Sequence, residues 1–161
     1  MAKRVYTQAF PAVNAVIEKD GNFLVVQQGK SKGIHEGYWA VPGGWIEAEN
    51  DDPIGAVIRE VKEETGLEFD PLGIVGIFSS ENHKFKEYFG GIPHPIKIVF
   101  FGEVEGKIYP QDSNEIADTK WVGKEDLPKV KWRTPSDIEM FFSYLEGDKF
   151  PLSMIHHHVH K

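Results

Sequence analysis

Residues 43–67 constrain the possible fold of this chain more than any other stretch of its sequence. A pair of glycines and an acidic loop lead into a segment that carries the start and stop signals of one helix. Asp52 is a good N-cap, Pro53 suits the first helical position, and Gly66 suits the residue just past the end. The stretch therefore predicts a glycine turn, a loop and a helix over 53–65.

The predicted helix has two chemically different faces. Its apolar residues recur at helical spacing on one stripe, and three glutamates lie at i, i+3 and i+4 on the opposite face. Carboxylates this close repel one another, and a hard divalent cation removes that repulsion because Mg²⁺ and Mn²⁺ prefer oxygen ligands. The pattern indicates a metal-binding platform; the alternative is an ordinary solvated helix face. The stripe comprises Ile54, Val57, Ile58, Val61 and Thr65, and the acidic face comprises Glu60, Glu63 and Glu64, with Arg59 on its flank.

The same stretch resembles the Nudix box, G-x5-E-x7-R-E-U-x-E-E-x-G-U, in which U is a large aliphatic residue. The matching positions are Gly44, the run Arg59-Glu60-Val61, the pair Glu63-Glu64, and the closing Gly66-Leu67. We expect the whole chain to adopt the fold that this resemblance implies. That fold is of the α/β class, a Nudix-like α/β/α sandwich with a mixed β-sheet between helices.

The chain departs from the box at one place. It has one extra residue between Gly44 and Arg59. Counting back from Arg59 puts Asp51 where the family has its first glutamate, and counting forward from Gly44 puts Asn50 there. We take Asp51 as the match, because the insertion then falls in the loop and leaves the helix register intact.

The resemblance also implies an activity and a set of residues for it. Nudix hydrolases cleave a pyrophosphate link with the help of divalent cations, so Mg²⁺ or Mn²⁺ is the implied cofactor. Glu60, Glu63 and Glu64 would supply metal contacts, and the Gly44 carbonyl would be another ligand. Arg59 would hold the carboxylates in place through its planar guanidinium group.

Two glutamates are candidates for the general base. Glu63 is available on the helix itself. Glu115 precedes the Trp121-Val122 segment, where similar proteins often carry a catalytic or metal-binding acid. A surface loop acid is the alternative interpretation of Glu115.

The residues that would contact the substrate are expected in two loops. The stretch 80–95 is long and irregular for a small domain, which favours a functional loop. In it, Phe85 and Tyr88 could stack a base beside lysines; a solvated loop whose aromatics cap the core is the alternative. Tyr38, just before the glycine turn, could line the same cleft.

Composition narrows the class of protein. No apolar run approaches the length of a membrane span, and the N-terminus lacks the apolar region of a signal peptide, so we expect a cytoplasmic protein without membrane contact. Without cysteine there is no disulfide framework and no thiolate nucleophile. A net charge of −7 argues against a nucleic-acid polymer as the ligand and leaves a small nucleotide-type substrate. The chain could also form a homodimer.

We expect one domain over 1–161, with its core at about 10–147 and a C-terminal tail over 148–161 that could be mobile. Alternating and apolar runs predict strands, and a second helix is predicted after Thr134-Pro135. The histidines near the C-terminus could bind a metal, but a frayed end is the more typical interpretation. The predicted strands are 12–18 and 22–28, joined as a hairpin, then 73–80, 96–104 and 120–122, and the second helix has Ile138, Phe141, Phe142 and Leu145 on its apolar stripe.

Three functions therefore remain open at this stage. The first is hydrolysis of a nucleoside diphosphate linked to another moiety, such as ADP-ribose or a sugar nucleotide. The second is removal of oxidised nucleoside triphosphates, which differs only in substrate. The third is a catalytically weak domain that senses a nucleotide, which the Asp51 departure permits but the intact metal set disfavours.

Overall fold

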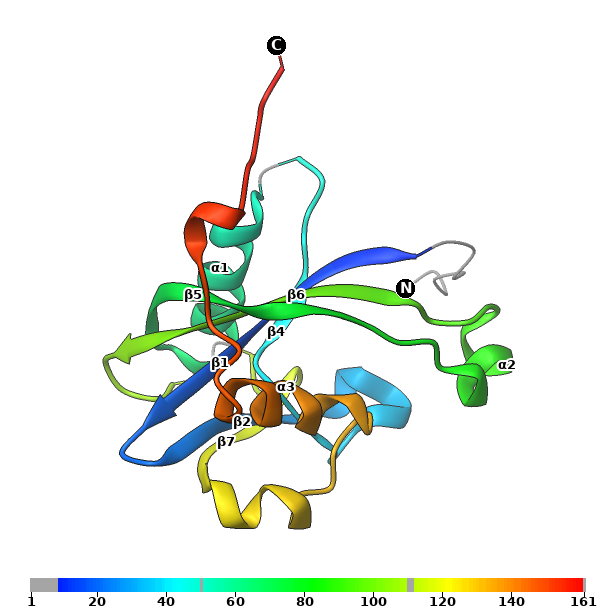
Figure 1. Cartoon of the computed structure of the whole chain (residues 1–161). Coiled ribbons are helices and arrows are strands. Elements are labelled where there is room, and N and C mark those ends of the chain that lie inside the picture. The colour runs from blue at the N-terminus through cyan, green and yellow to red at the C-terminus, as the bar shows by residue number, and fades with distance from the viewer. Residues whose placement is uncertain (1–8, 50, 110–111, 161) are drawn as a thin grey trace.

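The computed structural model describes residues 9–49, 51–109 and 112–160 (Figure 1). It begins with the predicted hairpin, formed by β1 (Phe10–Lys19) and β2 (Asn22–Gln28). Asp20 and Gly21 both have positive φ, of 52° and 78°. This is the geometry that matches the twist of a two-residue hairpin. The hairpin predicted from the sequence is confirmed.

An eight-stranded sheet forms the centre of the described chain, in the order β3-β2-β1-β6-β5-β8, with β4 joined to β1 and β7 joined to β2. β1 and β6 run parallel, whereas the other strand pairings of the described residues are antiparallel. The expected mixed sheet is therefore confirmed. The remaining strands are β3 (Trp39–Ala40), β4 (Gly43–Trp45), β5 (Glu68–Ser79), β6 (Pro95–Glu105), β7 (Ile116–Gly123) and β8 (Phe150–Pro151).

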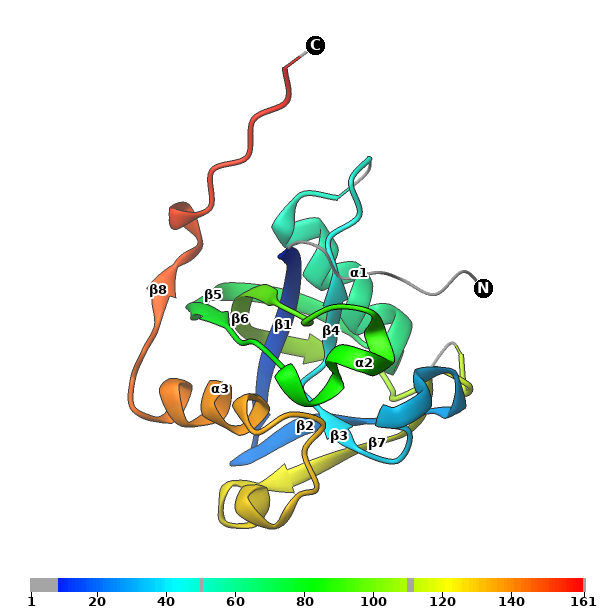
Figure 2. The same cartoon turned by 90° about the vertical axis from the view of Figure 1, so that its right-hand side faces the viewer.

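Helices α1 (Pro53–Thr65) and α3 (Ser136–Leu145) cover opposite faces of this sheet (Figures 1 and 2). The alternation along β1 explains the arrangement. Val13 and Ala15 point into the core on the α1 side, and Val16 points into the core on the α3 side. A short helix, α2 (Lys86–Phe89), lies at the far end of the β5–β6 ribbon (Figure 1).

The boundaries of α1 follow the predicted signals. The Asp52 side chain accepts a hydrogen bond from the Gly55 backbone N–H at 3.0 Å, Pro53 is the first helical residue, and Gly66 ends the helix at φ 78°. One prediction about its faces needs correction. Glu64 belongs with Ala56, Val57, Val61 and Thr65 among the buried residues, so the acidic face is not uniformly solvated. This burial determines part of the geometry of the site.

The apolar stripe predicted for the second helix is confirmed at Ile138 and Phe141 but not at Leu145. Asp137, Met140 and Phe141 are buried, whereas Leu145 is 42% exposed. Asp137 is not part of the predicted stripe, and its ion pairs with Lys97 and Arg133 offset the cost of its burial. The helix is therefore rotated relative to the expected stripe.

Part of the segment 148–161 is structured. Strand β8 pairs with β5 opposite Gly73 and Ile74, and Leu152 and Ile155 pack against the core on the α1 side. Residues 156–160 extend away from the body (Figures 1 and 2). In the part of the chain that the structure describes, no helix has the length and apolar character that a membrane crossing needs.

The register of α3 is testable by stability measurements. Met140 is fully buried, so Met140→Ala removes packed atoms and is expected to lower the free energy of unfolding by about 2–5 kcal/mol. Leu145→Ala, the matched control on the exposed side, is expected to change it by less than about 1 kcal/mol. Urea unfolding followed by circular dichroism measures both. Equal losses would mean that Leu145 packs as the sequence pattern suggested.

Candidate active site

The site is built where strand β4 passes close to helix α1. At Gly44, a methyl group in place of hydrogen would lie 2.5 Å from the carboxyl carbon of Glu60. Only glycine permits this approach without displacing the carboxylate. One residue earlier, the Gly43 N–H donates to Glu64 Oε2 at 2.9 Å. The two glycines therefore bring backbone groups against two acids of the helix.

Arg59 connects the acids to one another. Its guanidinium group binds both carboxylate oxygens of Asp51, at 2.6 and 3.3 Å, and also contacts Glu60 at 2.8 Å and Glu63 at 3.1 Å. A bidentate pair of this kind fixes the orientation of both side chains. The hydrogen bond from Arg59 lowers the pKa of Asp51. Asp51, which was chosen by counting back from the helix, is therefore one of the acids that Arg59 contacts. Asn50, the alternative position, lies outside the described residues.

Burial affects the protonation of two box acids. Burial raises the pKa of Glu64 to about 8, although the Gly43 hydrogen bond opposes the shift. Burial also raises the pKa of Glu60, where Arg59 opposes it and Glu63 and Glu115 add to it. Placing a cation at these oxygens would favour the charged forms, because opposite charge offsets the loss of solvation.

The chemistry of these side chains fits a hard divalent cation. They offer carboxylate oxygens beside backbone groups of the glycine turn, the donor set typical of Mg²⁺ or Mn²⁺. Over the described ranges, no three His, Asp or Glu side chains are gathered into a finished metal cage. Arg59 accounts for part of this, since it binds Glu60 and Glu63 itself.

A cavity of about 590 Å³ opens beside the glycine turn. It extends from Gly43 and Gly44 to the 80–95 segment and to the start of α3. Among the described residues, its lining contains three basic side chains and no acid. The basic side chains are Lys32, Lys97 and Arg133, and the aromatic ones, apart from His35, are Phe10, Trp45, Phe85, Tyr88 and Phe89.

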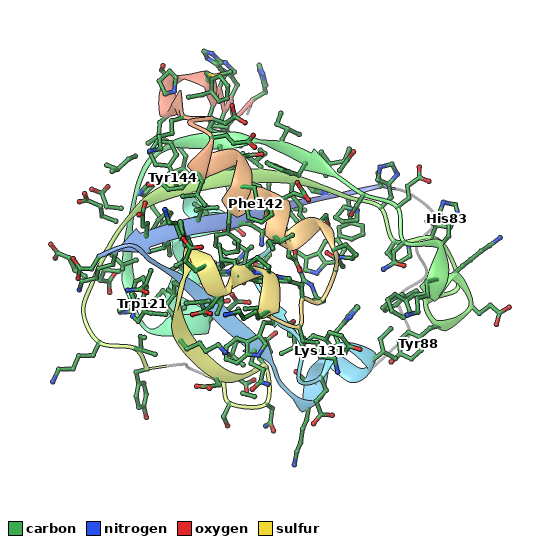
Figure 3. The ribbon with its side chains drawn as sticks, turned by 60° about the horizontal axis from the view of Figure 1, so that its bottom comes forward. His83, Tyr88, Trp121, Lys131, Phe142 and Tyr144 are labelled. Carbon is green, nitrogen blue, oxygen red and sulfur yellow. The ribbon has the colours of Figure 1, made fainter. Side chains whose placement is uncertain are left out.

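The residues predicted to bind substrate are divided between two places. Phe85 and Tyr88 line the cavity. Tyr88 lies on the 83–89 segment, which Figure 3 shows standing off from the main body, and its hydroxyl lies close to Gly33 of the facing loop. Tyr38 is not among the described lining residues. Its ring lies under the Lys131 ammonium group instead, at 4.2 Å.

Glu115 lies at the edge of the same site. Its carboxylate pairs with Lys32 at 2.9 Å, and its side chain is 46% exposed. It is close enough to Glu60 to raise the pKa of that acid. The structure therefore brings Glu115 near the box helix, although the two are far apart in sequence.

The sequence analysis missed several lining residues. His35 contacts Phe85 and Phe89, with ring centroids 5.5 and 6.2 Å apart, and burial lowers its pKa to about 4. Lys97 could have been identified from the sequence, because a single lysine inside an apolar strand is unusual. Arg133 carries no pattern that distinguishes it from a surface arginine.

Comparison with known proteins decides the family. The model of the NUDIX domain matches residues 8–144, most of the chain. The chain belongs to the Nudix family. It is a Nudix-type pyrophosphohydrolase, and members of this family use divalent metal ions.

Individual Nudix relatives agree with the family match. An ADP-ribose pyrophosphatase of Methanocaldococcus jannaschii is 28% identical, over 89% of this chain and 79% of its own length. The nucleoside triphosphatase NudI of Escherichia coli is 28% identical, over 70% and 80%. The chain spans less than half of several larger curated relatives that it also matches. A solved Nudix hydrolase of Nitrosomonas europaea superposes with a TM-score of 0.82 at 25% identity, covering 94% of this chain and 98% of that one.

The contact between Gly44 and Glu60 gives a prediction for this Nudix site. Gly44→Ala places a methyl group in the space of the Glu60 carboxylate, so Mn²⁺ binding is expected to weaken about tenfold or more. Isothermal titration calorimetry with Mn²⁺ measures the change. The matched control is Gly123→Ala, where the new methyl group meets only the Asn22 side chain at 3.4 Å. Wild-type affinity in Gly44→Ala would contradict the importance of this contact.

Proposed function

We propose that this protein hydrolyses the pyrophosphate link of a nucleoside diphosphate joined to a second moiety, such as ADP-ribose or a sugar nucleotide, with Mg²⁺ or Mn²⁺. The observation that carries the proposal is the single cavity that joins the box glycines to an aromatic wall. Its volume of about 590 Å³ lies within the usual range for small-molecule sites. The similarity to an ADP-ribose pyrophosphatase makes ADP-ribose the first substrate to assay.

The charges of the cavity support an anionic ligand. The whole chain carries a net charge of −7, yet the described lining has three basic side chains and no acid. Such a local reversal attracts a negatively charged small molecule to one place on an acidic protein. A long nucleic-acid polymer would need a basic surface beyond the cavity.

The aromatic wall supports a nucleotide. Phe85 and Phe89 meet edge to face, with centroids 6.3 Å apart, and Tyr88 packs against Phe89 at 4.8 Å. Rings held in this way offer faces and edges on which a base can stack. Stacking at this end would leave the diphosphate at the end near Gly44.

The chemistry follows from the box. A divalent cation supplies charge neutralisation on the phosphates and activation of water. Glu60, Glu63 and Glu64 would bind the cation, and the Gly43 N–H holds the Glu64 carboxylate in position. Arg59 keeps the orientation of the acids through its pairing with Asp51. The base that removes the proton from water is either Glu63 or Glu115.

Metal dependence gives the first test of this function. Release of AMP from ADP-ribose is expected to stop in EDTA and to return with Mg²⁺ or Mn²⁺. Glu63→Gln and Glu64→Gln keep size but remove a charged ligand, so the rate is expected to fall about 10²-fold or more. Glu125→Gln is the control, because that side chain is 85% exposed and lies outside the cavity.

The same assay separates the two candidate bases. A lost metal ligand raises the Mg²⁺ concentration needed for half-maximal rate, whereas a lost base lowers the rate at saturating Mg²⁺ and removes the acidic limb of the pH profile. Glu63→Gln and Glu115→Gln are compared on both readouts. Turnover that persists after thorough chelation would refute the metal-centred mechanism.

A further prediction concerns the aromatic wall. Phe85→Ala and Tyr88→Ala remove ring surface from the cavity, so KM for the preferred substrate is expected to rise about 5- to 100-fold with kcat nearly unchanged. Steady-state kinetics across ADP-ribose, sugar nucleotides, dinucleoside polyphosphates and oxidised dNTPs measures both constants. Tyr109→Ala is the matched control, because that residue is 74% exposed and outside the cavity. If both wall variants keep the wild-type KM and substrate ranking, the base binds elsewhere.

A further inference from the structure

A cluster of three charged side chains lies at the cavity wall, with Lys97 and Arg133 in the lining. Lys97 comes from β6, Asp137 from α3, and Arg133 from the turn before α3. Asp137 Oδ1 lies 3.6 Å from Lys97 Nζ and 3.7 Å from an Arg133 terminal nitrogen. The Lys97 side chain is 8% exposed and that of Asp137 is fully buried.

The hydrogen-bonding capacity of this cluster is only partly used. Asp137 Oδ2 accepts a hydrogen bond from the Thr134 N–H at 3.2 Å, but Oδ1 has no partner within hydrogen-bond distance in the structure. Lys97 has three N–H donors and faces a single carboxylate, at 3.6 Å. The Lys97 ammonium group lines the cavity, so its remaining N–H donors can serve an acceptor that enters there.

The net charge of the cluster indicates what that acceptor is. Two cations face one carboxylate, so the cluster carries one unbalanced positive charge. Burial lowers the pKa of Lys97, as expected for an ammonium group with too little compensating charge. An anionic oxygen beside Lys97 and Arg133 would balance the charge and accept the free donors. Lys97 and Arg133 line the cavity, whereas Asp137 lies behind them.

The position of Lys97 in the sheet separates it from the box turn. Ala12 of β1 lies between Trp45 of β4 and Lys97 of β6, each pair in register. Two strand spacings of the sheet put the Trp45 and Lys97 backbones roughly 10 Å apart. A diphosphate held near Gly44 therefore leaves Lys97 to a different part of the substrate. Arg133 lies between the two places, because it is close enough to Glu64 to oppose the rise in the pKa of that acid.

We propose that Lys97 and Arg133 form a second anion subsite, which binds an anionic group of the substrate outside the link that is cleaved. The group is a phosphate monoester or a carboxylate. The preferred substrates are then nucleoside diphosphate derivatives that carry a third acidic group. The substrates named in this inference depend on the proposed function, whereas the binding of an anion by Lys97 and Arg133 does not.

Substrate pairs that differ by one acidic group test this subsite. The phosphate pairs are ADP-ribose and its 2′-phosphate, NADH and NADPH, and dephospho-coenzyme A and coenzyme A; the carboxylate pair is UDP-glucose and UDP-glucuronate. In at least one pair, the wild-type kcat/KM is expected to be at least about tenfold higher for the member with the extra anionic group. The difference is expected in KM rather than in kcat. A preference in the phosphate pairs identifies the bound group as a phosphate, and a preference in the carboxylate pair identifies it as a carboxylate.

Variants assign the preference to the cluster. Lys97→Met keeps the length of the side chain and removes its charge. In a pair for which the wild type shows a preference, the ratio of the two kcat/KM values is therefore expected to fall to about one. Lys97→Arg keeps the charge and is expected to retain most of the ratio. Lys124→Met, on an exposed side chain outside the cavity, is the control and keeps the wild-type ratio. A wild-type ratio of one in every pair, or a ratio unchanged in Lys97→Met, overturns the proposal.

A binding measurement keeps the test independent of catalysis. Inorganic phosphate is titrated calorimetrically in EDTA, so that no metal site contributes. The wild type is expected to bind phosphate about tenfold or more tightly than Lys97→Met, and the control Lys124→Met is expected to bind it as the wild type does. If no substrate is cleaved but this difference holds, the proposed function fails and the subsite stands. If phosphate binds equally to the wild type and Lys97→Met, the subsite is refuted.

Discussion

The close approach of strand β4 to helix α1 is the constraint on which the rest of the site depends. Because Gly44 has no side chain, the backbone of the turn can lie against the Glu60 carboxylate. Because β4 also pairs with β1, the sheet fixes the position of that turn. The acids of a helix on one face are thereby joined to a cavity that reaches the other face. A shift of either element would separate the acids from the end of the cavity that Gly43 and Gly44 line.

Local sequence signals were enough to predict the elements that build this contact. The Asp52 cap, the Pro53 start and the Gly66 stop are short-range features, and each occurs in the structure as expected. The β1–β2 hairpin is similarly local. Counting back from the helix selected Asp51, and in the structure its carboxylate contacts Arg59.

Long-range contacts explain what the sequence could not predict. An aspartate on a helix is usually exposed, and the burial of Asp137 depends on its pairing with Arg133 and with Lys97 of a distant strand. The same burial rotated the helix away from its predicted stripe. The burial of Glu64 also depends on a contact distant in sequence, because its carboxylate accepts a hydrogen bond from a backbone N–H of the glycine turn. Tyr38 was predicted from its closeness to Gly43 in sequence, but the chain turns between them and directs its ring to Lys131.

Strand β8 has a consequence for how copies of the protein behave in a crowded solution. It covers the outer edge of β5 at Gly73 and Ile74, where hydrogen-bonding groups would otherwise be open to a strand from another molecule. Its second residue, Pro151, has no N–H to offer to a further strand. Chains cut before residue 148 would expose that edge beside the apolar side chains of Leu72 and Ile77. Proteolytic trimming of this segment would then favour sheet-to-sheet aggregation without removing any described lining residue of the cavity.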